Sequence, residues 1–90
     1  MTSKEYRPDK VGLIISRREE ERIYILKENS KPLIITLLEI DKDKARFGIN
    51  AQEEYKVYRE EVIKYNHPSI LDQLRQGGII TREMLDSFLK

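Results

Sequence analysis

Three arginine residues are the side chains in this sequence best suited to a local basic site. Arg17 and Arg18 are adjacent at the end of an apolar run, and Arg59 ends a run in which polar and apolar residues alternate. A guanidinium group is a planar fork of N–H donors that matches phosphates and guanine edges, and it stacks on bases. Acidic neighbours at 19–21 and 60–61 leave surface ion pairs as the alternative interpretation.

The charge balance limits what such a site can bind. Lys and Arg total 17, Asp and Glu total 16, and the net charge is +1. A protein that coats nucleic acid regardless of sequence needs a broad positive field, which this balance does not provide. A histone-like function is therefore excluded, whereas a small basic site is not.

Neither catalysis nor a metal site is expected. The chain has no cysteine and one histidine, which excludes disulfides, zinc–thiolate sites and cysteine nucleophiles. Ser69, His67 and Asp72 could be drawn as a triad, but no nucleophile-elbow glycine pattern positions them. Asp41 and Asp43 lack the glycine and distal glutamate of a calcium loop. We expect a protein that is not an enzyme and has no cofactor.

The length of 90 residues allows one small domain. Such a chain buries only roughly 60–65% of the surface that its unfolded form exposes, which favours a dimer with a shared core. No apolar run approaches the ~20 residues of a membrane span. The first residues are polar without a signal-peptide core, and the absence of cysteine fits a reducing compartment, so we expect a cytoplasmic protein.

Hydrophobic periodicity predicts a mainly β chain, α+β overall, with five short antiparallel strands followed by short C-terminal helices. The strands are expected at residues 13–17, 22–26, 33–40, 45–49 and 55–59. These runs are rich in β-branched or alternating apolar residues and are separated by turn formers. The third run is the longest and is expected to be buried on both faces for part of its length. A charged hairpin turn is expected at 41–44.

After the fifth strand the period becomes helical. Glu60 and Glu61 are expected to open a short helix, because acidic residues in a first turn complement the helix dipole. Two more amphipathic helices are expected at 68–76 and 82–89, with a Gly-Gly pair ending the first. Helices this short need packing, so we expect them to form a hairpin on a dimer surface. Their apolar stripes consist of Ile70, Leu71 and Leu74, and of Leu85, Phe88 and Leu89.

Four ordered stretches resemble the carbon storage regulator family of bacterial RNA-binding proteins (CsrA/RsmA-like), also called repressor of secondary metabolites. The resemblance covers about 50 residues, and the combination of Arg-Phe-Gly-Ile-Asn-Ala with a later Tyr-Arg-Glu-Glu is its most specific part. The four stretches are residues 13–18 with Glu21, residues 34–40, residues 45–51 and residues 57–62.

This resemblance implies an intertwined homodimer of five-stranded chains, in which the first strand of one chain lies beside the last strand of the other. It implies a post-transcriptional regulator that binds GGA motifs in single-stranded loops of mRNA leaders. Such binding controls translation and mRNA stability, and small decoy RNAs with many such motifs titrate the protein away. The RNA-binding positions that the resemblance transfers to this sequence are Ile15, Ser16, Arg17, Arg18, Ala51, Val57, Arg59 and Val62.

The departures from the family pattern give a second hypothesis. Glu19 and Glu20 stand where the family has a small residue and a glycine, so we expect a changed turn and negative charge beside the first strand; Gln52 replaces a proline. We divide the chain into an extension at 1–12, the RNA-binding domain at 13–65 and a C-terminal extension at 66–90. The alternative function is a protein-interaction module with weakened RNA binding, and a protein antagonist could bind the C-terminal extension.

Overall fold

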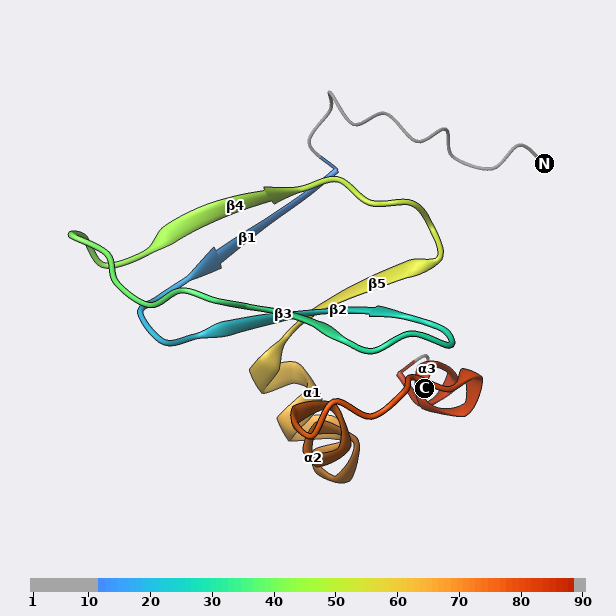
Figure 1. Cartoon of the computed structure of the whole chain (residues 1–90). Helices are drawn as coiled ribbons and strands as arrows, with labels where there is room; N and C mark the ends of the chain where they lie inside the picture. The colour runs from blue at the N-terminus through green and yellow to red at the C-terminus, as the bar shows by residue number, and fades with distance from the viewer. Residues whose placement is uncertain (1–11, 89–90) are drawn as a thin grey trace.

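The computed structural model describes residues 12–88 and contains five strands and three short helices (Figure 1). The part of the chain described has no helix long and apolar enough to cross a membrane. The elements are β1 (Leu13–Arg17), β2 (Arg22–Lys27), β3 (Leu33–Thr36), β4 (Ala45–Ile49), β5 (Tyr55–Arg59), α1 (Glu60–Asn66), α2 (Pro68–Arg75) and α3 (Arg82–Ser87).

The five strands form two separate antiparallel sheets. β1 and β4 make a two-stranded ribbon, and the second sheet has the order β3-β2-β5. In Figure 1 the ribbon lies on one side of the three-stranded sheet and the helices lie on the other. The mainly β architecture with C-terminal helices that the sequence predicted is therefore confirmed.

The central strand β2 is buried on both of its faces. Tyr24 and Leu26 point to the helical side, and Ile23, which points the opposite way, is also fully buried. On the ribbon, Ile15 is buried and pairs with Phe47 of β4. The alternation expected for β4 is present, because the residues on either side of Phe47 along the strand are exposed.

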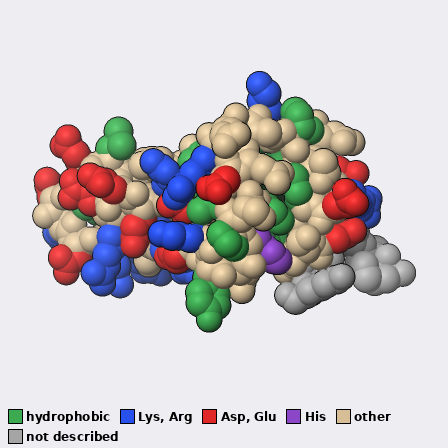
Figure 2. Space-filling view, turned by 90° about the horizontal axis from the view of Figure 1, so that it is seen from below, with side chains coloured by type: hydrophobic (Ala, Val, Ile, Leu, Met, Phe, Trp, Pro, Cys, Tyr) green, Lys and Arg blue, Asp and Glu red, His purple; other side chains and the backbone are tan. Residues whose placement is uncertain are grey.

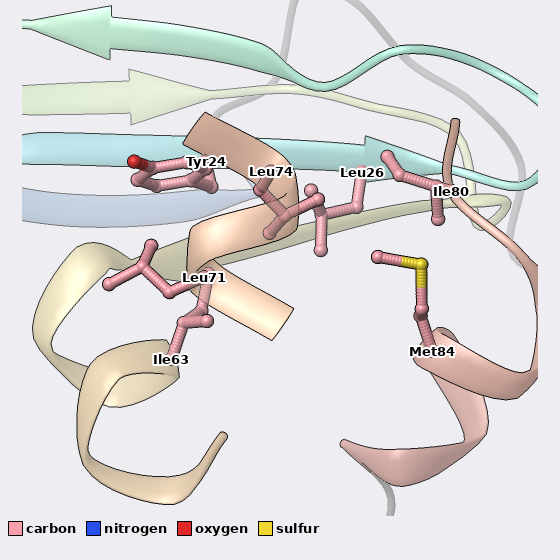
Figure 3. Close-up of a cluster of buried hydrophobic side chains, with 7 residues drawn as sticks. All are labelled: Tyr24, Leu26, Ile63, Leu71, Leu74, Ile80 and Met84. Atoms are coloured by element: carbon pink, nitrogen blue, oxygen red, sulfur yellow. The ribbon is translucent and has the colours of Figure 1, made fainter. Parts of the chain in front are cut away.

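The helices are held by one hydrophobic cluster that they share with β2 (Figure 3). Figure 3 shows the side chains of α1 and α2 directed toward those of β2, with Met84 of α3 approaching from the other end. The C-terminal helices thus pack on the sheet of their own chain. The cluster consists of Tyr24, Leu26, Ile63, Leu71, Leu74, Ile80 and Met84.

The C-terminal segment also bonds to the turn between β2 and β3. The N–H of Asn29 donates to the carbonyl of Ile80, and the N–H of Ile80 donates to the carbonyl of Ser30, at 2.8 and 2.9 Å. Arg82 forms an ion pair with Glu28 at 3.3 Å. The turn between β2 and β3 is therefore where the C-terminal segment docks.

The helix ends follow the sequence signals. Pro68 occupies the first turn of α2, and Gly77, at φ 77°, follows its end. Thr81 caps α3, because its hydroxyl oxygen accepts the N–H of Met84 at 3.2 Å. Of the expected apolar stripes, Leu71 and Leu74 are buried, and Leu89 lies outside the described residues.

The prediction for the third strand was wrong in length. β3 ends at Thr36, because its partner β2 begins at Arg22 and offers no strand residue opposite 37–40. Leu33 is 56% exposed and Leu38 is 70% exposed in this chain. The segment 41–44 is not a hairpin turn either, since β3 and β4 lie in different sheets.

All the strand pairing described is within one chain. β1 pairs with β4 and β5 pairs with β2, so the expected neighbour of β1 in a partner chain is not part of this structure. The C-terminal end of β1 nevertheless lies against the start of α1, which directly follows β5. The first and last strands therefore meet through their ends within the chain.

The turn between β1 and β2 contains a residue in an unusual backbone conformation. Glu20 has φ 70°, in the left-handed region that glycine adopts most readily. The N–H of this residue donates to the carbonyl of Leu37, which ties the turn to the segment after β3. The left-handed turn that a family glycine would favour is therefore made by a glutamate, at a conformational cost of about 1 kcal/mol.

This geometry predicts that Glu20→Gly stabilises the protein. Removing the left-handed strain slightly outweighs the added freedom of the unfolded chain, so we expect a gain of up to about 0.5 kcal/mol and a melting temperature up to about 4 °C higher. Thermal unfolding followed by circular dichroism measures the shift. Glu19→Gly is the matched control, because Glu19 has no positive φ and its replacement is expected to destabilise. Equal shifts in both variants would contradict the prediction.

Candidate nucleic-acid interface

Arg17 is buried and bonded, and it joins the end of β1 to the start of α1. Its side chain is 5% exposed, and both terminal nitrogens donate to the carboxylate of Glu61, with Nη1 to Oε1 at 2.8 Å. Nη1 also donates to the carbonyl of Arg22 at 3.2 Å, and Nε donates to the carbonyl of Ser16 at 2.9 Å. The guanidinium group of Arg17 is hydrogen-bonded to other protein groups and does not face solvent.

The neighbouring carboxylate, Glu60, is bonded to β2 and α2. Its Oε2 atom accepts the hydroxyl of Tyr24 at 2.8 Å and nitrogens of Arg22 and Arg75, each at 3.3 Å. The Glu60 side chain is mostly buried, at 19% exposed. Two adjacent acidic residues thus bind guanidinium groups from three different elements.

Arg18 and Arg59 are the predicted site arginines that remain available. Both are exposed, and neither side chain has a hydrogen bond or ion pair with another residue of the segment 12–88. Arg18 follows Arg17 and Arg59 lies two residues before Glu61, so both flank the Arg17–Glu61 bond along the chain. Figure 2 shows cations and anions interspersed over one face, so a local site stands out by its unpaired groups rather than by a broad field.

The other predicted RNA-binding positions differ in how exposed they are. Ser16 is half-buried, whereas Ile15 on the same strand is buried. Val57 is half-buried in the middle of β5, and Val62 on α1 is 39% exposed. Ile15 therefore supports the strand from inside, and Ser16 and Val62 are near the exposed arginines in sequence.

Ala51 lies away from this group. The register pairs Arg17 with Ala45 and Leu13 with Ile49, so the loop after β4 leaves at the opposite end of β1. Ala51 is exposed there and borders a cavity of about 560 Å³ between the ribbon and the three-stranded sheet. The cavity is lined by Ile25, Lys27, Ser30, Lys31, Leu33, Ile49, Asn50, Ala51, Gln52 and Tyr55.

The bonds at the junction shift the ionisation of its groups. The hydrogen bond from Arg17 lowers the pKa of Glu61 to about 2 and raises the pKa of Arg17. Burial opposes ionisation of Glu60, but the Tyr24 hydroxyl and Arg75 outweigh it, and its pKa is lowered. Burial, with the carboxylate of Glu60, raises the pKa of Tyr24. Both carboxylates are therefore ionised at neutral pH.

Comparison with known proteins supplies the family. The model of the CsrA global regulator protein family matches residues 13–66, which is more than half of the chain. The chain belongs to the CsrA family. It is also 30% identical over 71 residues to a protein of Halothermothrix orenii named translational regulator CsrA, an alignment that covers 79% of this chain and 83% of that protein. No solved structure matches this chain significantly.

The region that the CsrA family model matches ends where helix α1 ends. It includes all five strands and α1, and it ends at the last residue of α1. Helices α2 and α3 lie beyond it, yet they share the hydrophobic cluster with β2. This member of a family of regulators therefore carries a helical extension that is part of its core.

Sequence reasoning missed the residues that organise this site. Glu60 and Glu61 were interpreted as acidic residues that complement a helix dipole or pair with Arg59, and their observed partners in β1, β2 and α2 were not predicted. The available signal was their charge beside Arg59, but a partner such as Arg17 is 44 positions away. Ile80 and Met84 were also missed as core residues, although an apolar pair after the two glycines was visible in the sequence.

The depressed pKa of Glu61 predicts an acid-sensitive contribution to stability. Its folded pKa of about 2 lies below the ordinary 4.5, so the contribution is complete above about pH 5 and is lost as pH falls toward 2. The Glu61 side chain is 55% exposed, so screening limits this contribution to about 1 kcal/mol.

Urea unfolding of Glu61→Gln between pH 7 and pH 2 measures this contribution. We expect the variant to be about 1–2 kcal/mol less stable at neutral pH and to converge with the wild type in acid. Glu54→Gln is the control, because Glu54 lies in an exposed turn. A constant difference between Glu61→Gln and wild type across the whole range would contradict the assignment.

Proposed function

We propose that this chain is a post-transcriptional regulator that binds GGA motifs in single-stranded mRNA leader loops and thereby controls translation and mRNA stability. The observation that carries the proposal is that Arg18 and Arg59 are exposed and that neither guanidinium group has a hydrogen bond or ion pair within the described segment. Single-stranded loops present base edges that a duplex RNA major groove hides, and guanidinium groups bind those edges and the phosphates. Membership of the CsrA family supports this assignment.

The proposal gives the predicted residues different roles. Arg18 and Arg59 contact RNA, and in the intertwined dimer Arg18 and Ser16 of one chain lie beside Arg59 and Val62 of the other. Arg17 acts by position, because its guanidinium is buried against Glu61 and holds the end of β1 at the junction. Ala51 and Val57 belong to a second part of the interface, to which a neighbouring chain in a dimer can contribute.

Binding by Arg59 is tested with a GGA hairpin RNA and a scrambled control. We expect Arg59→Ala to weaken binding by about 1.5–3 kcal/mol per site, because charge-assisted hydrogen bonds are lost. Fluorescence titration at fixed salt measures the dissociation constant. Lys56→Ala is the matched control, since Lys56 is an exposed cation on the same strand whose side chain alternates to the other face.

The outcomes separate the two functional hypotheses. Loss of affinity in Arg59→Ala but not in Lys56→Ala supports the RNA-binding proposal. A folded wild-type protein that does not distinguish the GGA hairpin from the scrambled RNA would favour the protein-interaction module instead. Decoy activity of a small RNA is a separate measurement, in which a chain with several GGA motifs competes with the hairpin.

The dimer is part of the same proposal. The apolar side chains of Leu33 and Leu38 are exposed in the single chain, and family resemblance implies an intertwined dimer that would cover such residues. A dimer would carry two RNA sites.

Light scattering near micromolar concentration is expected to give about twice 10.7 kDa. Leu33→Asp should shift the mass toward that of one chain, because a charge cannot be buried unpaired at an interface. Ile79→Asp is the control, since Ile79 is exposed to a similar degree, 52% against 56%, but lies in the C-terminal extension. A folded wild-type monomer at this concentration would overturn the dimer.

A further inference from the structure

We propose that Arg75 of α2 is a positioning residue for RNA binding, which acts by holding Glu60 and, through it, the adjacent Arg59. This inference rests on the proposed function of Arg59. It gives the C-terminal extension a role in the affinity of the RNA site, although the CsrA family model matches only residues 13–66.

Arg75 extends from a helix that is fixed in place. Leu71 and Leu74 of α2 are buried in the cluster with Tyr24 of β2, as Figure 3 shows. Arg75 is the last residue of this helix. Its guanidinium is therefore delivered to Glu60 from an element that is itself packed on the sheet.

Arg75 contacts a single carboxylate oxygen of Glu60, which accepts three hydrogen bonds. Oε2 of Glu60 accepts Tyr24, Arg22 and Arg75. Tyr24 and Arg22 belong to β2, whereas Arg75 is the donor that comes from beyond residue 66. Without Arg75, the carboxylate is bonded to β2 alone, and its side-chain bond to α2 is lost.

Glu60, the residue that Arg75 holds, directly follows the exposed Arg59 in the sequence. Arg59 has φ −68° and ψ 144°, at the point where the chain leaves β5 and enters α1. The Arg59 side chain has no hydrogen bond or ion pair within the described segment, although its charge acts on Glu61, so the backbone at this residue sets where the side chain begins. The side chain of Glu60 fixes the next residue of that backbone, and Arg75 completes the fixation. Holding an arginine in place before RNA binds lowers the ordering cost of binding.

The test uses the full-length protein and the GGA hairpin RNA. We expect Arg75→Ala to weaken binding about threefold to tenfold, and Arg75→Lys to recover part of the affinity because it restores a cation. Arg82→Ala is the matched control, since Arg82 is also an extension arginine in a 3.3 Å ion pair, but with Glu28 at the β2–β3 turn. Thermal unfolding of both alanine variants separates this effect from a general loss of stability.

A double-mutant cycle distinguishes positioning from direct contact. If Arg75 acts through Arg59, Arg75→Ala has no further effect on affinity in the Arg59→Ala background. The same loss in both backgrounds would show that Arg75 binds RNA itself and would overturn the inference. Equal affinities of wild type, Arg75→Ala and Arg82→Ala would also overturn it, while leaving RNA binding by Arg59 intact. A wild type that fails to bind the hairpin would instead refute the proposed function.

Discussion

Two adjacent carboxylates at the junction of β5 and α1 join the layers of this protein. Glu61 binds Arg17 at the end of the two-stranded ribbon, and Glu60 binds β2 and α2. Since neighbouring residues in a first helical turn point in different directions, one short segment can connect elements on opposite sides of the sheet. The ribbon, the sheet and the helical extension therefore meet at one place, where the chain changes from strand to helix.

The same junction determines which arginine side chains are paired with carboxylates and which are exposed. Arg17 is neutralised inside the protein, Arg22 and Arg75 are neutralised at Glu60, and Arg18 and Arg59 are left exposed and unpaired within the described segment. A protein with a net charge of +1 has no broad field with which to attract RNA. A site in such a protein depends on where the unpaired groups lie, and hence on the contacts that neutralise the others.

Strand and helix positions were largely predictable, because they depend on local chemistry. Alternating apolar residues predicted β4 and β5, and the Gly-Gly pair at 77–78 marked the end of α2 where the structure has it. The third strand failed for a nonlocal reason. Its apolar run continues past Thr36, but pairing stops where β2 begins, and a run of side chains carries no information about the length of its partner.

The sequence by itself determined the chemistry available to this protein: guanidinium groups at the ends of two strands, no thiol, a near-zero net charge, and the motif order of the CsrA family. Tertiary structure decided which guanidinium group is bonded inside the protein and which is exposed to solvent. Arg17 and Arg18 are equivalent in type and adjacent in sequence, yet one is buried against Glu61 and the other is exposed. The difference arises because Arg17 is the last residue of β1 and its side chain meets a carboxylate 44 residues away, whereas Arg18 lies in the turn that follows the strand.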